Sequence, residues 1–167
     1  MPETSDCFAA DFRRRLADIG VEAVVIGAVA AARYRLTPRQ TVDVDFLARS
    51  VDGLPEAMRR QGYDVHTMAE PGTDQPYVVF IRGADVAVDV LLAETDYQRT
   101  AMDRAVDGVI TAEDVVIHKL LAWRPRDRDD IASIFATGRE LDEAYIEDWA
   151  DAWEVGDRWE QAQRELR

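Results

Sequence analysis

The sequence predicts an α+β fold, in which a small mixed β-sheet is flanked by helices and followed by a helical C-terminal part. Short runs rich in β-branched residues alternate with helical segments between residues 21 and 92. From Thr111 onwards, the apolar residues recur at helical spacing. We therefore expect an α/β core over residues 1–110 and a helical part over residues 111–167, which packs on the core or continues it as one domain.

The first part of the chain carries the expected strands. An apolar stripe at helical spacing predicts a helix over residues 5–19, which Gly20 ends. Further helices are expected at residues 28–34, 52–61 and 96–105. Strands are expected at residues 21–26, 42–48, 63–68, 77–82 and 85–92, with a short extended piece at 108–110. The last two strands are expected to form a hairpin at Gly83-Ala84.

The helical part opens at Thr111, because Thr111-Ala-Glu-Asp114 resembles a capping box. The helix that follows is expected to run to about Trp123, where Pro125 interrupts it. Further helices are expected at residues 126–136 and 140–153. Gly156 is expected to end the latter, and Asp157 to cap a final helical segment.

Composition narrows the class of protein. The chain has 167 residues, one cysteine and a formal net charge of -13. A single cysteine excludes an internal disulfide. A polar N-terminus and the lack of a long apolar stretch predict a cytoplasmic protein without a signal peptide or a membrane span. The negative charge argues against broad nucleic-acid binding, because such binding depends on neutralising phosphates.

Three aspartates are expected on one face of the sheet. Residues two apart on a strand share a face, so Asp43 and Asp45 point the same way. Asp89 lies on a later strand whose opposite face carries only valine and leucine. If the two strands are neighbours, the three carboxylates converge. The alternative is that they are solvated residues on half-exposed strands.

Convergent carboxylates need a cation, because without one they repel each other and their pKa values rise. Mg²⁺ prefers carboxylates completed by substrate phosphates, and two such ions can bind the attacking and the leaving oxygen of a phosphoryl displacement. We therefore expect Asp43, Asp45 and Asp89 to bind one or two Mg²⁺ ions, with a nucleoside triphosphate as substrate.

The phosphate end of this site is expected at Gly27, where a strand ends and a helix begins. Such a junction presents backbone N–H groups and a favourable dipole, and a residue without Cβ lets a phosphate approach closely. Arg33, Arg35 and Arg39 follow, and they either contact phosphates or balance an acidic surface. We favour Arg39, which shares a turn with Thr41, as the contact.

These residues together resemble the nucleotidyltransferase fold of the DNA polymerase β superfamily. The superfamily signature is a hydrophobic-Gly-[Gly/Ser] turn, a helix, an Asp-x-Asp strand and a third aspartate on a later strand. It is matched here by Ile26-Gly27-Ala28, by Val42-Asp43-Val44-Asp45-Phe46 and by Val88-Asp89-Val90. Ala28 departs from the pattern, because it offers no hydroxyl to a phosphate.

The subgroup that fits best is the AbiEii-like minimal nucleotidyltransferases, many of which are toxins of toxin–antitoxin or phage-defence systems. This resemblance is carried by the string Arg39-Gln-Thr41-Val-Asp43-Val-Asp45 and, after Lys119, by Arg126-Asp127-Arg-Asp-Asp130-Ile131. It extends over residues 23–134 of the chain.

The resemblance implies Mg²⁺-dependent transfer of a nucleoside monophosphate from an NTP to tRNA or protein, with release of pyrophosphate. It further implies an antitoxin as partner. Asp43 and Asp45 would hold the metal, and Asp89 would complete the site. Lys119 would contact the triphosphate, and Asp127 would support catalysis or hold Lys119. The expected nucleotide contacts are Gly27, Ala28, Arg39, Thr41 and Lys119.

Other interpretations stay open. Lys119 is the only lysine beside 19 arginines, which indicates either chance or a role that arginine cannot fill. Asp127, in the first turn of a helix, also suits the helix dipole. An antibiotic nucleotidyltransferase acting on a small cationic drug, an aminoglycoside or a lincosamide, suits the net charge. A catalytically silent binding protein with the same fold suits Ala28.

Overall fold

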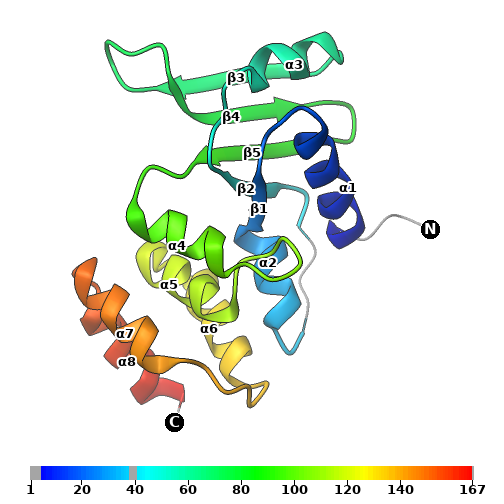
Figure 1. Ribbon diagram of the computed structural model, residues 1–167. Coiled ribbons are helices and arrows are strands. Elements are labelled where there is room, and N and C mark those ends of the chain that lie inside the picture. Colours follow the sequence, from blue (N-terminus) through cyan, green and yellow to red (C-terminus); the bar gives the residue numbers. More distant parts are fainter. Residues whose placement is uncertain (1–4, 38–40, 167) are drawn as a thin grey trace. The chain divides into compact units, whose positions relative to one another are not determined.

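The computed structural model describes residues 5–37 and 41–166 (Figure 1). The chain forms two compact units. The first comprises Met1–Val29 and Gln40–Ile110, and the second comprises Ala30–Arg39 and Thr111–Arg167. Helix α2 (Gly27–Tyr34) begins in the first unit and ends in the second. The second unit therefore combines a helical C-terminal segment with a short segment from the first half of the chain.

The first unit contains a mixed sheet that has five strands within the described residues, in the order β1-β2-β5-β4-β3 (Figure 1). The strands are β1 (Ala23–Ile26), β2 (Val44–Ala48), β3 (Asp64–Ala69), β4 (Pro76–Arg82) and β5 (Ala87–Leu92). β2 and β5 are parallel, and the other neighbouring pairs are antiparallel. The predicted α+β class and mixed sheet are confirmed.

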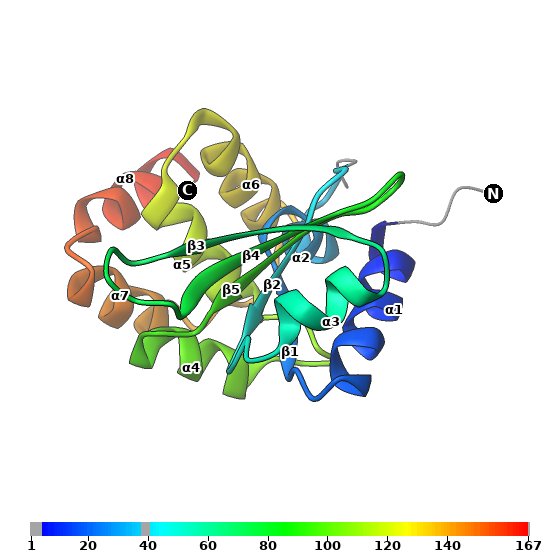
Figure 2. The same cartoon turned by 90° about the horizontal axis from the view of Figure 1, so that it is seen from above.

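One face of this sheet is apolar and packs against helices. The buried residues that point to it from the two parallel strands are Val44, Phe46, Val88 and Val90. Helix α1 (Ser5–Asp18) places Phe12 against Phe46, with ring centroids 6.0 Å apart. Figure 2 shows α1 and α3 (Leu54–Arg60) on the same side of the sheet. The opposite face carries Asp45 and Asp89, and we call it the polar face, although it also includes the buried Leu47.

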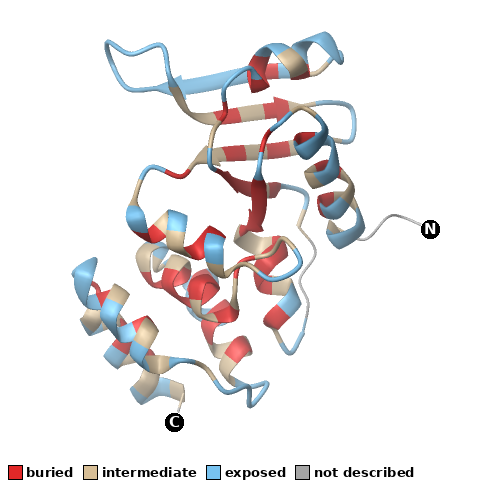
Figure 3. Ribbon diagram, in the orientation of Figure 1, coloured by how far each residue is buried: buried red, intermediate tan, exposed pale blue. Residues whose placement is uncertain are grey.

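Burial is uneven across the sheet. Figure 3 shows buried residues along β1 and β2, whereas the edge strand β3 is mostly exposed. After the sheet, α4 (Asp96–Arg104) begins at a capping box in which the Thr95 side chain accepts the Gln98 N–H at 3.1 Å. The carboxylate-bearing strands β2 and β5 are thus interior strands, flanked on both sides by hydrogen-bonded neighbours.

The strand that carries Asp45 is shorter than predicted. It was expected to begin at Val42, but Val42 is 87% exposed and β2 begins at Val44. The cause is local, because the Thr41 hydroxyl donates a hydrogen bond to the carbonyl oxygen of Asp43 at 3.2 Å. Such a side-chain bond competes with the ladder of the sheet. Asp43 therefore precedes the strand.

β1 and β5 each begin two residues later than predicted. Val21 belongs to the turn that follows α1, since its N–H donates to the carbonyl oxygen of Leu16 at 2.9 Å. The N–H of Gly83 donates to the carbonyl oxygen of Val86 at 2.9 Å, which closes the turn between β4 and β5. The predicted hairpin is confirmed, but residues 85 and 86 belong to its turn and not to β5.

The second unit is helical. Its C-terminal segment contains α5 (Ala112–Ala122), α6 (Pro125–Phe135), α7 (Glu143–Ala152) and α8 (Gly156–Leu166). The predicted cap is present, because the Thr111 side chain accepts the Asp114 N–H at 3.3 Å. The prediction for Gly156 was wrong: it begins α8, and Asp157 lies inside the first turn. No helix in the described part of the chain is long and apolar enough to cross a membrane.

Replacing Phe46 by alanine tests the packing of the first unit. Phe46 has no exposed surface, so its loss leaves a cavity between β2 and α1. We expect Phe46→Ala to lower the free energy of unfolding by about 3–5 kcal/mol. Val42→Ala, four residues earlier in the chain, should change it by less than about 0.5 kcal/mol. Urea unfolding measures both, and equal effects would show that this face is not the core.

Candidate active site on the polar face of the sheet

A row of side chains crosses the polar face of the sheet. Asp45 on β2 is in register with Ile26 on β1 and with Asp89 on β5. Asp89 is in turn in register with Phe80 on β4, which pairs with His66 on β3. Residues in register on neighbouring strands point to the same face, about 5 Å apart. The two aspartates therefore lie side by side, as the sequence analysis expected if their strands were neighbours.

Asp43 does not join them as a third member of the row. It lies before β2 and is exposed. Within residues 5–37 and 41–166, no group of three Asp, Glu, His or Cys side chains is arranged to hold a metal ion. The convergence of all three carboxylates therefore stays a prediction: the structure pairs Asp45 with Asp89, and the turn at Thr41 places Asp43 before the strand.

Arg82 on β4 contacts Asp89, which the sequence analysis missed. The guanidinium Nη2 lies 2.7 Å from Asp89 Oδ1. This oxygen is shielded from solvent and has no hydrogen bond of normal geometry within the described residues. The contact is therefore mainly an attraction between opposite charges. The sequence carried a signal for this contact. Arg82 lies two residues from Phe80 on the same strand and so points to the same face as Phe80 and its partner Asp89.

Position 27 requires a glycine, because its backbone lies against the Asp45 side chain. Gly27 has a φ of +68°, a conformation that residues with a side chain rarely adopt. A Cβ added here would overlap Asp45 Oδ2 and would lie 2.9 Å from Asp45 Cγ. The sequence indicates one reason for a glycine here, which is that a phosphate can approach its backbone closely. The structure adds a second reason, because the Asp45 carboxylate packs against the first residue of α2.

The carboxylate pair is chemically suited to Mg²⁺. Two adjacent anionic oxygen donors, of which one has a solvent-shielded oxygen without a hydrogen bond, match the preference of Mg²⁺ for one or two carboxylates completed by substrate phosphates. Asp43, on the same segment as Asp45, offers a further exposed carboxylate. These residues therefore fit the expected metal, although they do not form a three-carboxylate cage.

The structure describes most, but not all, of the other residues that the sequence suggested as phosphate or nucleotide contacts. Ala28 is half-buried in the first turn of α2, and the Thr41 hydroxyl bonds to the Asp43 carbonyl oxygen. Arg39 lies outside the described residues. In the second unit, Arg35 forms an ion pair with the buried Asp130, and its Nε donates to the Thr37 carbonyl oxygen at 3.1 Å.

Lys119 lies in a buried cluster of charges in the second unit. Its Nζ is 3.1 Å from Asp127 Oδ1 and 2.8 Å from Asp130 Oδ2. Both aspartates come from α6 and have no exposed surface, and Lys119 is 7% exposed. Arg124 adds a second cation, with Nε 2.7 Å from Asp127 Oδ2. The i, i+3 spacing of the aspartates on α6 is the sequence signal for Asp130, which the analysis left out of its site.

Protonation in this cluster follows from burial and pairing. Burial raises the pKa of Asp127, but hydrogen bonds from Arg124 and Lys119 outweigh it and leave the pKa below its ordinary value. Burial, together with the neighbouring Lys119 ammonium, lowers the pKa of His118 to about 4. Asp127 is therefore an anion and His118 a neutral ring at pH 7.

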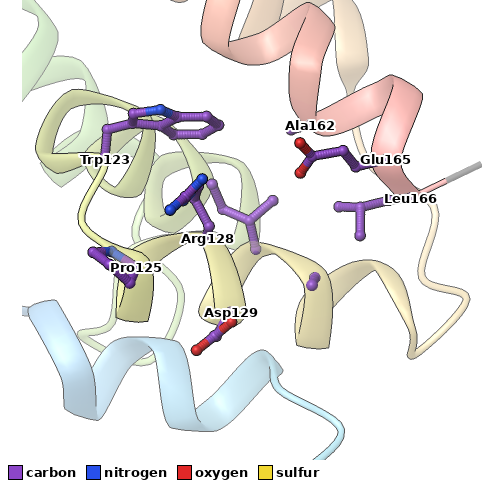
Figure 4. A pocket seen from close by; sticks show the side chains of 9 residues that line it. Trp123, Pro125, Arg128, Asp129, Ala162, Glu165 and Leu166 are labelled. Atoms are coloured by element: carbon purple, nitrogen blue, oxygen red, sulfur yellow. The ribbon is translucent and has the colours of Figure 1, made fainter.

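A cavity in the second unit contains none of the predicted site residues. It has a volume of about 250 Å³ and lies between Trp123, α6 and the end of α8 (Figure 4). Arg128 lies over the Trp123 ring, 5.8 Å from its centroid, and Glu165 faces them from α8. Its lining is mixed, without a buried polar side chain directed into it, and we assign it no role.

Solved structures of similar fold include nucleotidyltransferase-like proteins. The antibiotic-resistance factor ANT(2'')-Ia matches with a TM-score of 0.55 over 96% of this chain and 93% of its own, at 15% identity. An antigenic nucleotidyltransferase-like protein from Paracoccidioides brasiliensis matches with a TM-score of 0.51 over 81% and 77%, at 17% identity.

A tRNA nucleotidyltransferase matches at 19% identity with a TM-score of 0.37, and this chain spans only 27% of its length. No protein-family model and no curated protein matches the chain. The two longer matches show that the chain has the fold found in nucleotidyltransferase-like proteins, as the sequence predicted.

Gly27→Ala tests the contact between α2 and Asp45. Gly53 is a matched control, since its φ is +69° and no atom lies within 4 Å of an added Cβ. Gly53→Ala should cost about 1–2 kcal/mol of unfolding free energy for the left-handed backbone alone. Gly27→Ala should cost more, because it adds the overlap with Asp45. The difference between the costs of the two substitutions should shrink when Asp45 is also replaced by alanine. A difference that stays the same would contradict the contact between Gly27 and Asp45.

The buried carboxylate of Asp127 should make stability depend on pH. Its folded-state pKa is below the ordinary value of 3.8, so the unfolded state binds more protons at acid pH. Its contribution is complete above the unfolded pKa and is lost as the pH falls through the folded one. Wild type should therefore lose more stability below pH 4 than Asp127→Asn does. Asp129→Asn, on the exposed side of α6, should follow wild type in urea unfolding.

Proposed function

We propose that the protein transfers a nucleoside monophosphate from an NTP to an acceptor with Mg²⁺ as cofactor. The observation that carries the proposal is the in-register pair Asp45 and Asp89, with Asp45 packed against Gly27 at the start of α2. A carboxylate pair beside a helix N-terminus supplies both a cation site and backbone donors for phosphate. The shared fold of nucleotidyltransferase-like proteins supports the same reaction.

In this mechanism the residues of the first unit bind and orient. Asp45 and Asp43 hold the metal, and Asp89 completes the site and accepts the proton of the acceptor hydroxyl. The metal, when bound, neutralises charge on the triphosphate. The N-terminal turn of α2, at Gly27 and Ala28, binds phosphate oxygens through backbone N–H groups. The acceptor oxygen forms a bond to the α-phosphorus, and the bond to pyrophosphate breaks.

For the second unit, we propose that Lys119 contacts the triphosphate and that Asp127 holds Lys119. What supports the second part is the 3.1 Å ion pair between them, and the buried Asp130 contributes another. Arg39 and Thr41 are proposed as further phosphate contacts. Lys119→Arg should lower the rate, since a planar guanidinium does not reproduce the compact ammonium that pairs with two buried carboxylates.

We further propose an AbiEii-like, toxin- or defence-related role, with tRNA or protein as acceptor and an antitoxin as partner. This rests on the sequence motifs around Asp43 and Asp127. An antibiotic nucleotidyltransferase is the second candidate. The observation that favours it is the match to an antibiotic-resistance factor over nearly the whole length of both chains. The net charge of -13 also suits a cationic drug.

Labelled NTPs test the reaction and identify the acceptor. The protein is incubated with each labelled NTP, Mg²⁺ and either tRNA, cell protein or an aminoglycoside. Label should appear in one acceptor fraction, and Asp45→Asn should lower its rate about 10²–10³-fold. Asp85→Asn, in the exposed turn before β5, is the matched control and should keep wild-type activity. Circular dichroism confirms that both variants fold.

The outcomes separate the candidates. Label in tRNA or protein supports the defence-like role, and label in the drug supports the antibiotic enzyme. If wild type labels no fraction, the result favours a catalytically silent binding protein with the same fold. If Asp45→Asn and wild type label the acceptor equally, the carboxylate pair is not the active site.

A further inference from the structure

Arg82 is fixed at the carboxylate pair by several contacts besides its ion pair. Its Nη1 donates to the Ile81 carbonyl oxygen at 3.0 Å and to the Val88 carbonyl oxygen at 2.9 Å. Its guanidinium carbon lies 5.6 Å from the centroid of the Phe80 ring, within cation–π range. These contacts hold the guanidinium on the polar face whether or not Asp89 is charged. Arg82 is therefore a built-in cation next to Asp89.

The carboxylate pair needs such a cation when no metal is bound. Asp45 and Asp89 are in register on neighbouring strands, where like charges destabilise a sheet. The Arg82 guanidinium, 2.7 Å from Asp89 Oδ1, offsets that repulsion. Because the Asp89 side chain is only 24% exposed, water screens the pair incompletely. The metal-free protein is thus stabilised by an arginine where the loaded protein would have a divalent ion.

Arg82 also hinders the binding of a divalent cation at Asp89. Asp89 Oδ1 has no solvent-exposed surface, so a cation reaches it only when a neighbouring group moves. The charged group in contact with it is Arg82. A divalent cation beside Asp89 would also be repelled by the guanidinium across a few ångströms. Metal binding and the Arg82–Asp89 ion pair therefore oppose each other.

We propose that Arg82 is a positioning residue that holds Asp89 in the metal-free protein and competes with the divalent cation for it. The proposal rests on the proposed function, since it assumes that Asp89 belongs to the metal site. Arg82 acts through Asp89. It lowers the affinity for free metal, so that the site fills when the phosphates of the substrate supply the remaining ligands.

Direct binding of Mn²⁺, as a probe ion, tests this without measuring activity. Free Mn²⁺ is followed by electron paramagnetic resonance during titration of the whole protein. Arg82→Gln should bind Mn²⁺ about tenfold more tightly than wild type, because one positive charge close to the ion is removed. Arg82→Lys keeps the charge and should stay close to wild type. In an Asp89→Asn background, Arg82→Gln should have no such effect.

A matched control separates the local effect from the change in net charge. Arg99 pairs with Asp96 at 3.1 Å on the exposed surface of α4 and loses the same charge when replaced by glutamine. Arg99→Gln should leave Mn²⁺ affinity unchanged. Thermal unfolding gives a second readout: Arg82→Gln should melt lower than wild type without metal, and Mg²⁺ should raise its melting temperature more.

Each result bears on the proposal. Mn²⁺ binding that is equal or weaker in Arg82→Gln than in wild type overturns it and leaves the proposed function standing. An equal gain in Arg99→Gln also overturns it, because the effect would then be general. If no variant binds Mn²⁺, even with a non-hydrolysable NTP analogue, the proposed metal site fails together with the inference.

Discussion

The side-by-side placement of Asp45 and Asp89 on parallel strands is the constraint around which the first unit is arranged. Two anions in this position repel each other, and three features of the chain accommodate them. Gly27 leaves room for the Asp45 carboxylate, and Arg82 neutralises Asp89. The opposite face of both strands is apolar and mostly buried, which offsets the cost of the charged one. The proposed chemistry lies on the face that carries the charged pair.

The second unit also holds two carboxylates close together, but there they are buried and paired with cations. Asp127 and Asp130 have no exposed surface, and three cations from separate segments surround them. Lys119 comes from α5, Arg124 precedes α6, and Arg35 follows α2. Removing one partner of such a cluster leaves an uncompensated buried charge, which is strongly destabilising. The cluster therefore fixes how these three segments meet, whatever further role Lys119 has.

Exposure distinguishes the two sets of carboxylates. Asp127 and Asp130 are buried, and Lys119 forms ion pairs with both of them. Asp89 keeps 24% of its side chain exposed and contacts one arginine. Removing a cation partner from a fully buried carboxylate leaves an uncompensated charge, which is strongly destabilising. This is the physical reason to place the cation at the sheet, and to regard the buried aspartates as the support for Lys119.

From the sequence alone one could predict the fold class, most of the elements and the strand face that carries each aspartate, but not that β2 and β5 are neighbours. The faces could be predicted because the alternation of apolar and acidic residues dictates which face of a strand is buried. Three further features became known from the folded chain: Asp43 precedes β2, Gly27 accommodates Asp45, and Arg82 contacts Asp89. These depend on a local side-chain hydrogen bond and on contacts between segments far apart in the chain, which periodicity does not encode.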